Sequence, residues 1–252
     1  MSKKKLIARR VRIPTGHWTA FSTEVFSEVL PQLRRQNSAR VYLAMYHHVW
    51  RTEKKSVAAS FATIAKWTRL DYRTVKGCFR ELQLKKFIVR ARQGTLRSRS
   101  DAPTWTVPAA KFNMKKQPWV PVPSFIITDY LRLHRACTLL PLLLYYQNMK
   151  WKNSSYPSAV TLHTMIHWEL NAVYGALKLM SDDKRWEKLC SALPRPLGIG
   201  RRKIKSGNKT YRYYRVLAVR YDRDDELPVV YLSEKFAKFF HIHSKKRHRK
   251  PR

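Results

Sequence analysis

The chain has 252 residues and holds 52 Lys and Arg against 16 Asp and Glu, a formal net charge of +36. A charge of this size repels itself in a compact fold and is typical of proteins that bind a polyanion, so the composition favours nucleic acid as the partner. An anionic membrane, an acidic protein and ribosomal RNA are the competing partners. Hydrophobic residues make up 44% of the chain, which predicts a packed core and excludes an intrinsically disordered chain.

The apolar segments of the sequence are too short to cross a membrane. The longest, residues 138–146, falls below the roughly 18 to 20 residues that a span requires and predicts a core helix with Pro141 in its first turn. The basic N-terminus is not followed by the apolar stretch of a signal peptide. Cys78, Cys137 and Cys190 are scattered and odd in number, which predicts reduced thiols in a cytoplasmic protein.

The first part of the chain predicts a basic arm followed by helices. Residues 1–20 are basic and interrupted by Pro and Gly, so we expect an arm there and a first domain at residues 21–112. Apolar residues recur at helical spacing over residues 23–36, and again from Ser38, a predicted N-cap, to Trp50.

Residues 61–100 predict two short helices, a tight turn and a two-stranded ribbon. Ser60 is a predicted cap for the first helix, and Asp71 for a second helix that ends at about Leu84. The apolar residues of the second helix predict a buried face of Val75, Cys78, Phe79 and Leu82. A strand, a turn-rich tip and a return strand then follow, in the segments FIVRARQ, GTLRSRSDAP and TWTVPA.

This order resembles the winged helix-turn-helix family over about residues 38–110. The resemblance implies that the third helix enters the DNA major groove and that the ribbon touches the backbone or the minor groove. It assigns Tyr72, Arg73, Thr74, Lys76 and Arg80 to the groove face, and Arg90, Arg92, Arg97 and Arg99 to the ribbon. The turn departs from the family pattern, because Arg69 stands where many members have Gly.

The second part of the chain predicts a repeat of the same order. Residues 113–124 are rich in Pro and Lys and predict a linker before a second domain at 125–240. The patterns predict helices over 131–151, over 159–168 after a cap at Ser158, and over 171–192, then a ribbon with its tip at Ser206-Gly207-Asn208. A weak internal echo pairs TIAKW at 63–67 with TMIHW at 164–168, and residues 75–79 with 173–177, if the second turn is two residues shorter.

The second ribbon is strongly basic, with no acidic residue from Arg195 to Tyr221. Alternation along a strand places part of its charge on one face, which favours contact with phosphates. The residues assigned to DNA there are Arg201, Arg202, Lys203, Lys205, Lys209 and Arg212. The helix from Asn171 is apolar early and mixed in charge late, so we expect it to serve in packing or in a dimer.

Two short clusters raise the question of a metal site. His241 to His243 resemble the His-hydrophobic-His site of nicking enzymes, but they run into the basic tail at 241–252 and no Tyr follows them. The acidic residues between Asp222 and Glu226 are typical of a polar turn. The sequence also lacks a Gly-rich phosphate loop and a nucleophile elbow, so we expect no metal, no cofactor and no enzyme activity.

The resulting hypothesis is a mainly helical α+β protein with two tandem winged-helix domains and basic tails that binds specific double-stranded DNA. This architecture resembles plasmid replication initiators and the replisome organisers of phages. The resemblance implies a cytoplasmic protein on a plasmid or the nucleoid that binds origin repeats, with a second copy and replication proteins as further expected partners. A transcriptional repressor, a nicking enzyme and an RNA-binding protein are the alternatives.

Overall fold

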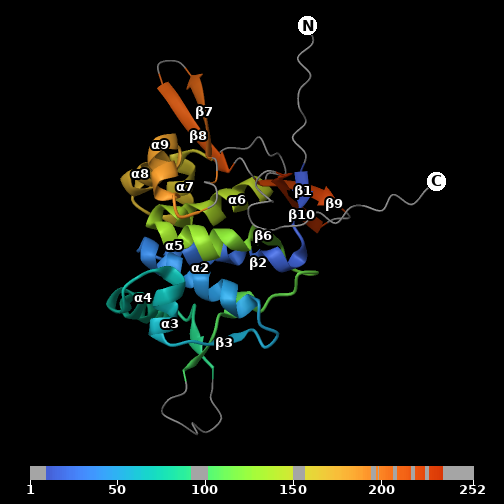
Figure 1. The fold of residues 1–252 in the computed structure, drawn as a ribbon, viewed down its shortest axis with the longest axis vertical. Helices are drawn as coiled ribbons and strands as arrows, with labels where there is room; N and C mark the ends of the chain where they lie inside the picture. Colours follow the sequence, from blue (N-terminus) through green and yellow to red (C-terminus); the bar gives the residue numbers. More distant parts are fainter. Residues whose placement is uncertain are drawn as a thin grey trace, which may run out of the picture.

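The computed structural model describes residues 10–91, 102–149, 157–193, 197, 199–206, 209–216, 219–224 and 227–234. The fold is α+β and mainly helical, with small antiparallel sheets (Figure 1). The two halves of the chain repeat one order of elements, and strands from both ends of the described chain add a small sheet beside them.

The first half runs from a strand through a π-helical turn to four α-helices, the first of a single turn, and a small sheet. Its elements are β2 (Trp18–Ser22), η2 (Val25–Val29, a π-helical turn), α1 (Leu30–Gln32), α2 (Gln36–Trp50), β3 (Ser56–Ala58), α3 (Phe61–Thr68), α4 (Tyr72–Leu84), β4 (Val89–Arg90), β5 (Thr104–Thr106) and η3 (Pro108–Ala110). β5 is the central strand of the sheet, because Trp105 lies opposite Val57 of β3 on one side and Arg90 of β4 on the other.

The second half follows a similar order of elements. Its elements are β6 (Trp119–Pro123), η4 (Ile126–Tyr130, again π-helical), α5 (Leu131–Leu133), η5 (Arg135–Thr138), α6 (Leu139–Met149), α7 (Ala159–Ile166), α8 (Leu170–Met180), α9 (Asp183–Leu189), β7 (Ile199–Ser206) and β8 (Lys209–Val216). Helix α9 and the 3₁₀ turn η5 are additions, since α4 leads directly to β4 and α1 is followed by α2. Strand β3 has no counterpart among the described elements of the second half. The remaining elements are β1 (Arg10–Arg12), η1 (Thr15–His17), β9 (Val219–Asp224) and β10 (Leu227–Ser233), and their strands form a sheet in the order β1-β10-β9.

Matching N-caps begin α3 and α7, the equivalent short helices of the two halves. The Oγ of Ser60 accepts a hydrogen bond from the Thr63 N–H at 3.1 Å, and its hydroxyl lies 3.0 Å from that of Thr63. Ser158 repeats both contacts with Thr161, at 3.0 and 2.9 Å. Each cap satisfies a backbone donor that the first helical turn leaves free, which explains why both helices begin at these serines.

The turns that follow these helices are also equivalent. Arg69 ends α3 with φ 50° and ψ 37°, and His167 ends α7 with φ 53° and ψ 20°. The left-handed conformation is therefore adopted without glycine in both halves, although glycine favours it most. Asp71 and Glu169 hold the N-cap positions of α4 and α8, so Arg73 and Asn171 occupy equivalent places in the first turn of each helix.

Strands β2 and β6 are equivalent elements that pair with each other. They run antiparallel with Trp18 opposite Pro123, Ala20 opposite Pro121 and Ser22 opposite Trp119. A local two-fold axis near Ala20 and Pro121 therefore exchanges the strands, and the rings of Trp18 and Trp119 stack 5.2 Å apart. The two halves are thus joined by a pair of strands with nearly two-fold symmetry.

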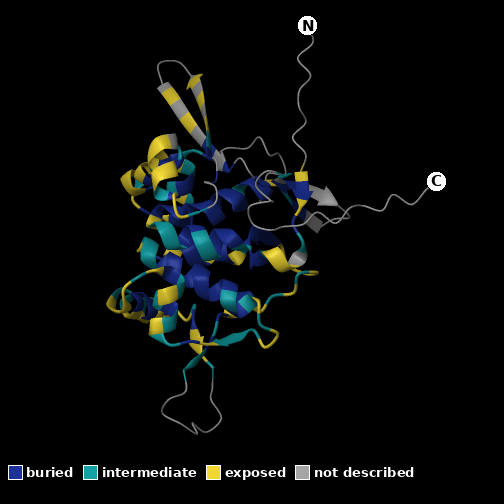
Figure 2. Cartoon of the chain, in the orientation of Figure 1, coloured by how far each residue is buried: buried dark blue, intermediate teal, exposed yellow. Residues whose placement is uncertain are grey.

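The contacts between the halves are reciprocal. Helix α1 of the first half contacts α7 of the second, and α5 of the second contacts α3 of the first. Phe26 stacks on Tyr145 with ring centroids 4.6 Å apart, and the Trp168 Nε1 donates to the Leu33 carbonyl at 2.8 Å. Buried residues fill the middle of the molecule, and α4, α8, α9 and the β7–β8 hairpin carry the exposed ones (Figure 2). One continuous core therefore serves both halves.

Two segments differ from the sequence prediction because they pair over long range. Residues 10–12 and 18–20 lie in β1 and β2, not in a free arm. Residues 119–123 of the predicted linker form β6, and all five are buried. Proline alternates with valine in β6, and a two-stranded pair tolerates this because only every second N–H points at the partner strand. The division into two domains remains a prediction.

The helix boundaries differ in four places. The predicted helix over residues 23–36 is the π-helical η2 and the one-turn α1, which ends at Gln32 because Leu33 is extended. Helix α2 begins at Gln36, before the predicted cap at Ser38. The predicted helix 131–151 is interrupted at His134, whose backbone is extended at φ −156° and ψ 149°. The predicted helix 171–192 is two helices, because Asp182 accepts a hydrogen bond from the Arg185 N–H and caps α9.

The proposed sequence echo was misaligned in its first part. Because Ser158 corresponds to Ser60, the counterpart of residues 63–67 is 161–165, not 164–168. The two turns are equal in length, so the pairing of residues 75–79 with 173–177 needs no shortening of the second turn.

Candidate nucleic-acid interface

Helix α4 separates an apolar face from a cationic one. Its buried residues are Val75, Cys78, Phe79 and Leu82, as the periodicity predicts. The predicted groove-facing cations of α4 are all exposed; they are Arg73, Lys76 and Arg80. Tyr72, on the same face, is 52% exposed and packs edge-on against Phe61. No ion pair involves these cations in the described part of the chain, so the helix presents an unneutralised positive surface.

The first turn of α4 is held by Asp71. Its carboxylate accepts from the Thr74 N–H at 2.8 Å and from the Thr74 hydroxyl at 2.5 Å. These hydrogen bonds lower the pKa of Asp71, so the cap stays ionised at neutral pH. Thr74 was predicted to face DNA, and the structure shows its hydroxyl donating to the cap, which leaves its methyl group and hydroxyl lone pairs for a ligand.

The sheet beside α4 is fixed by Trp105. Its Nε1 donates to the Ala59 carbonyl at 2.8 Å, and its ring packs edge-on against Phe79 with centroids 4.9 Å apart. This contact ties β5 to α4, and it places the exposed Arg90 of β4 at the root of the predicted ribbon. Arg92, Arg97 and Arg99, the other cations assigned to this ribbon, lie outside the described residues.

Helix α8 presents the surface that matches α4 by position but not by charge. The residues equivalent to Arg73, Lys76 and Arg80 are Asn171, Tyr174 and Lys178, and all three are exposed. The prediction assigned this helix to packing or to a dimer, because its sequence is apolar early and mixed in charge late. The repeated Ser-to-Thr cap and the matching turn were the signals in the sequence that could have identified its exposed face.

The β7–β8 hairpin places several cations on one face. Arg201, Lys203 and Lys205 alternate along β7 and are exposed, and Lys203 lies directly opposite the exposed Arg212 of β8. Like charges opposite each other destabilise a strand pair, so this arrangement is expected where a polyanion compensates them. Arg202 and Lys209 lie in the same strands, and their side chains are not among those described.

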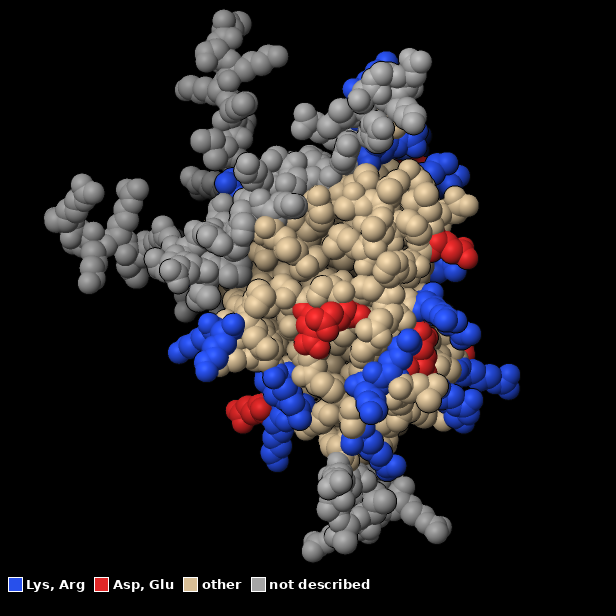
Figure 3. Space-filling model, turned by 180° about the vertical axis from the view of Figure 1, so that it is seen from behind, with Lys and Arg blue, Asp and Glu red and all other residues tan. Residues whose placement is uncertain are grey.

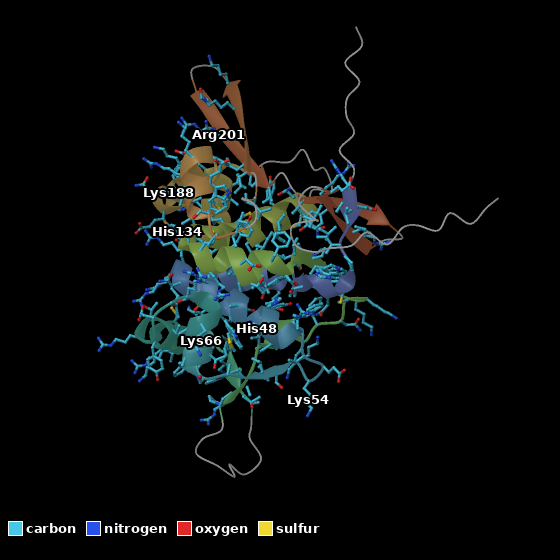
Figure 4. The ribbon with its side chains drawn as sticks, in the orientation of Figure 1. His48, Lys54, Lys66, His134, Lys188 and Arg201 are labelled. Carbon is cyan, nitrogen blue, oxygen red and sulfur yellow. The ribbon has the colours of Figure 1, made fainter. Side chains whose placement is uncertain are left out.

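These elements lie along one edge of the molecule. Helices α4 and α8 and the hairpin share the left edge of Figure 1, and from behind, Lys and Arg gather along the corresponding right edge of Figure 3. Figure 4 shows Arg201, Lys188 and His134 one below another on this edge, whereas Lys54 lies on the opposite lower side. Helices α4 and α8 and the labelled Arg201 of the hairpin therefore lie on the same side of the molecule, where Lys and Arg outnumber Asp and Glu in the view of Figure 3.

The cysteines belong to the core. Cys78, Cys137 and Cys190 are free and buried, and burial raises the pKa of Cys137 and of Cys190 to about 12. These two are therefore neutral thiols at neutral pH. The described residues contain no group of three or more His, Cys, Asp or Glu placed to hold a metal ion. His241 and His243 lie outside the described residues.

Comparisons with known proteins add no relative to this description. No protein-family model matches the chain, and no curated protein sequence matches it either. Within the described residues, no helix is long and apolar enough to span a bilayer.

Proposed function

We propose that each half of the chain is a winged helix and that the protein binds specific double-stranded DNA through both. The order of elements supports this proposal. In each half a helix is followed by a capped short helix, a tight turn, a further helix and an antiparallel hairpin or sheet. In this arrangement the helix after the turn is the one that enters the major groove, which assigns base contacts to α4 and α8.

The observation that carries the proposal is the shared edge of α4, α8 and the β7–β8 hairpin. Both helices turn their apolar residues inward and expose polar or cationic ones, although exposed charge on a helix is by itself common. What distinguishes this edge is the row of cations on the hairpin, whose two strands contain no Asp or Glu. Phosphates balance this charge and release counterions on binding.

The two helices carry different side chains at the position proposed to contact bases, and this difference indicates what kind of DNA site the protein binds. Arg73 suits the O6 and N7 of guanine, and Asn171, at the equivalent place, suits the N6 and N7 of adenine. A chain with a local two-fold axis and unequal readers fits an imperfect inverted pair of half-sites. Such a site has a direction, so it can be arrayed as direct repeats, and we therefore propose a replication initiator that binds origin repeats.

A transcriptional repressor remains the alternative, and the genomic position of the site separates the two. The experiment selects sites from random DNA with the full chain and then footprints the DNA that flanks its own gene. An initiator predicts several protected copies in the same orientation. A single protected site over a promoter would favour the repressor, and equal affinity for every sequence would contradict specific reading.

A further inference from the structure

An open cleft of about 670 Å³ lies between the two halves on the edge that carries α4 and α8. The corner between α1 and α2 lines it with Arg34 and Arg35, and η5 of the other half lines it with Arg135. Glu169, at the start of α8, is the one carboxylate in this lining. The cleft thus collects three guanidinium groups against one acid.

These guanidinium groups are not neutralised within the described part of the chain. Arg34, Arg35 and Arg135 are exposed, and none forms an ion pair with a described residue. Glu81 of α4 lies at the corner between α1 and α2. Its carboxylate accepts hydrogen bonds from the Arg34 backbone N–H at 3.3 Å and from the Ser38 hydroxyl at 2.6 Å. Its carboxylate is therefore engaged by neutral donors.

A further cation lies behind the cleft. Arg40 on α2 is only 5% exposed, and its Nε has no hydrogen-bond partner. Burial lowers the pKa of His134 in the cleft lining, and Arg135 and Arg40 lower it further, so both guanidinium groups act on this ring. A buried guanidinium with an unsatisfied Nε–H is costly, and an anion in the cleft would reduce that cost.

The opposite wall of the cleft is made of small side chains. Ala172, Gly175 and Ala176 of α8 face it, and a Cβ built on Gly175 would meet no atom within 4 Å. Because these side chains are small, a bulky polar ligand such as a sugar–phosphate backbone can approach the arginines closely. The cleft is lined by residues of both halves and lies against α8, one of the two equivalent helices α4 and α8. If those helices enter successive major grooves on one face of a duplex, the intervening minor groove faces this cleft.

We propose that Arg34, Arg35 and Arg135 bind the DNA backbone along the minor groove between the two half-sites, and so select its width. The inference rests on the proposed function. A·T tracts narrow the minor groove and deepen its negative potential, which attracts arginine. The protein then distinguishes spacer sequences whose bases neither α4 nor α8 contacts.

The test compares two duplexes with identical selected half-sites, one with an A-tract spacer and one with a G·C spacer of equal length. The wild-type protein should bind the A-tract duplex about 5-fold or more tightly. The triple variant Arg34→Ala, Arg35→Ala, Arg135→Ala should bind both spacers equally, and its log–log salt slope should be shallower by about 2 to 3. The three side chains are exposed, so its melting temperature should match that of the wild type.

The matched control removes three positive charges elsewhere, in Arg51→Ala, Lys54→Ala, Lys116→Ala. Arg51 and Lys54 follow the far end of α2, about 22 Å along the helix from Arg35 at 1.5 Å per residue. This control should keep the spacer preference. Equal spacer preference in the two triple variants, or none in the wild type, would overturn the inference.

The variant Arg73→Ala tests the proposed function independently of the spacer inference. If this variant no longer discriminates between selected and random half-sites, the proposed function is upheld whatever the spacer result.

Discussion

Arg73 and Asn171 hold equivalent positions in α4 and α8, but their side chains suit different bases. Both are exposed in the first turn of their helix, the part that points at base edges in helices of this kind. Arg73→Ala should cost about 1–3 kcal/mol on the selected site and much less on random DNA. Asn171→Ala should cost a similar amount at a base pair in the other half-site.

Competition titrations of both variants on selected and random duplexes measure these costs. Base substitutions in each half-site locate the contact, because a variant is insensitive to the base that it no longer reads. If Arg73→Ala weakened selected and random DNA by the same factor, α4 would be a phosphate-binding helix and not the reader.

His47 is a neutral buried base that links stability to pH. It shares a 2.6 Å hydrogen bond with Thr19, and burial, with smaller contributions from His48 and Arg51, lowers its pKa from 6.5 to about 3. The unfolded chain therefore takes up a proton below pH 6.5 that the folded chain refuses until about pH 3. The contribution of His47 to the free energy of unfolding is therefore fully present above pH 6.5 and is lost as the pH falls from 6.5 towards 3. Between pH 7 and pH 5 the loss is about 2 kcal/mol.

Urea unfolding at pH 7 and pH 5 tests this linkage with His47→Asn, which keeps a polar atom near the Nδ1 position. The difference in stability between the two pH values should shrink by about 2 kcal/mol in this variant. The matched control is His17→Asn, at an exposed site, and it should retain the wild-type difference. An unchanged difference in His47→Asn would mean that other groups control the acid sensitivity.

At the scale of elements, the equivalent caps predict equivalent energies. Ser60→Ala and Ser158→Ala each remove a bond to the third residue of the helix, and each should cost about 1 kcal/mol of unfolding free energy. The sites share no partner, so the double variant should lose the sum. Denaturant unfolding measures the cost, with Ser191→Ala as an exposed control. A large cost at one serine and none at the other would contradict the equivalence of α3 and α7.

The elements predicted correctly from the sequence are those that local spacing determines. Ser60, Asp71 and Ser158 are caps that hydrogen-bond within their own first turns, and the apolar face of α4 follows from its periodicity. The pairing of β2 with β6 was not predictable in this way, because its partners are distant in the chain and the prolines of β6 disguise a strand. The cap at Asp182 was a local signal that the prediction overlooked.

The residues of the candidate site were also predicted where local spacing determines them and missed where long-range packing does. Charge and position identified Arg73, Lys76 and Arg80 on α4 and the exposed face of the hairpin, since both depend on periods within one element. The face of α8 was missed because Asn171 and Tyr174 carry no charge. The cleft between the halves was missed because it joins Arg34 and Arg135, which only the packing of the two halves brings together.

At the scale of the whole molecule, the shared core predicts that the halves do not fold apart. A fragment ending at residue 112 loses β6 and exposes β2, together with Phe21, Phe26 and Leu30, which are almost fully buried in the intact chain. Burial of each such side chain is worth about 1.5–3 kcal/mol, so the fragment should show no cooperative thermal transition. Calorimetry of the fragment beside the full chain measures this. A sharp transition near that of the full chain would show that the first half folds alone.

The central claim is that one chain reads two half-sites related by its own two-fold axis. The most direct measurement is the affinity of the full chain for a duplex with both selected half-sites inverted at their natural spacing, against duplexes in which one half-site is flipped or moved by about 5 base pairs, half a helical turn. A rigid pair of readers should lose about 10²-fold or more in affinity on either altered duplex, down to the level of a single half-site. Equal affinity for all three duplexes would contradict the account.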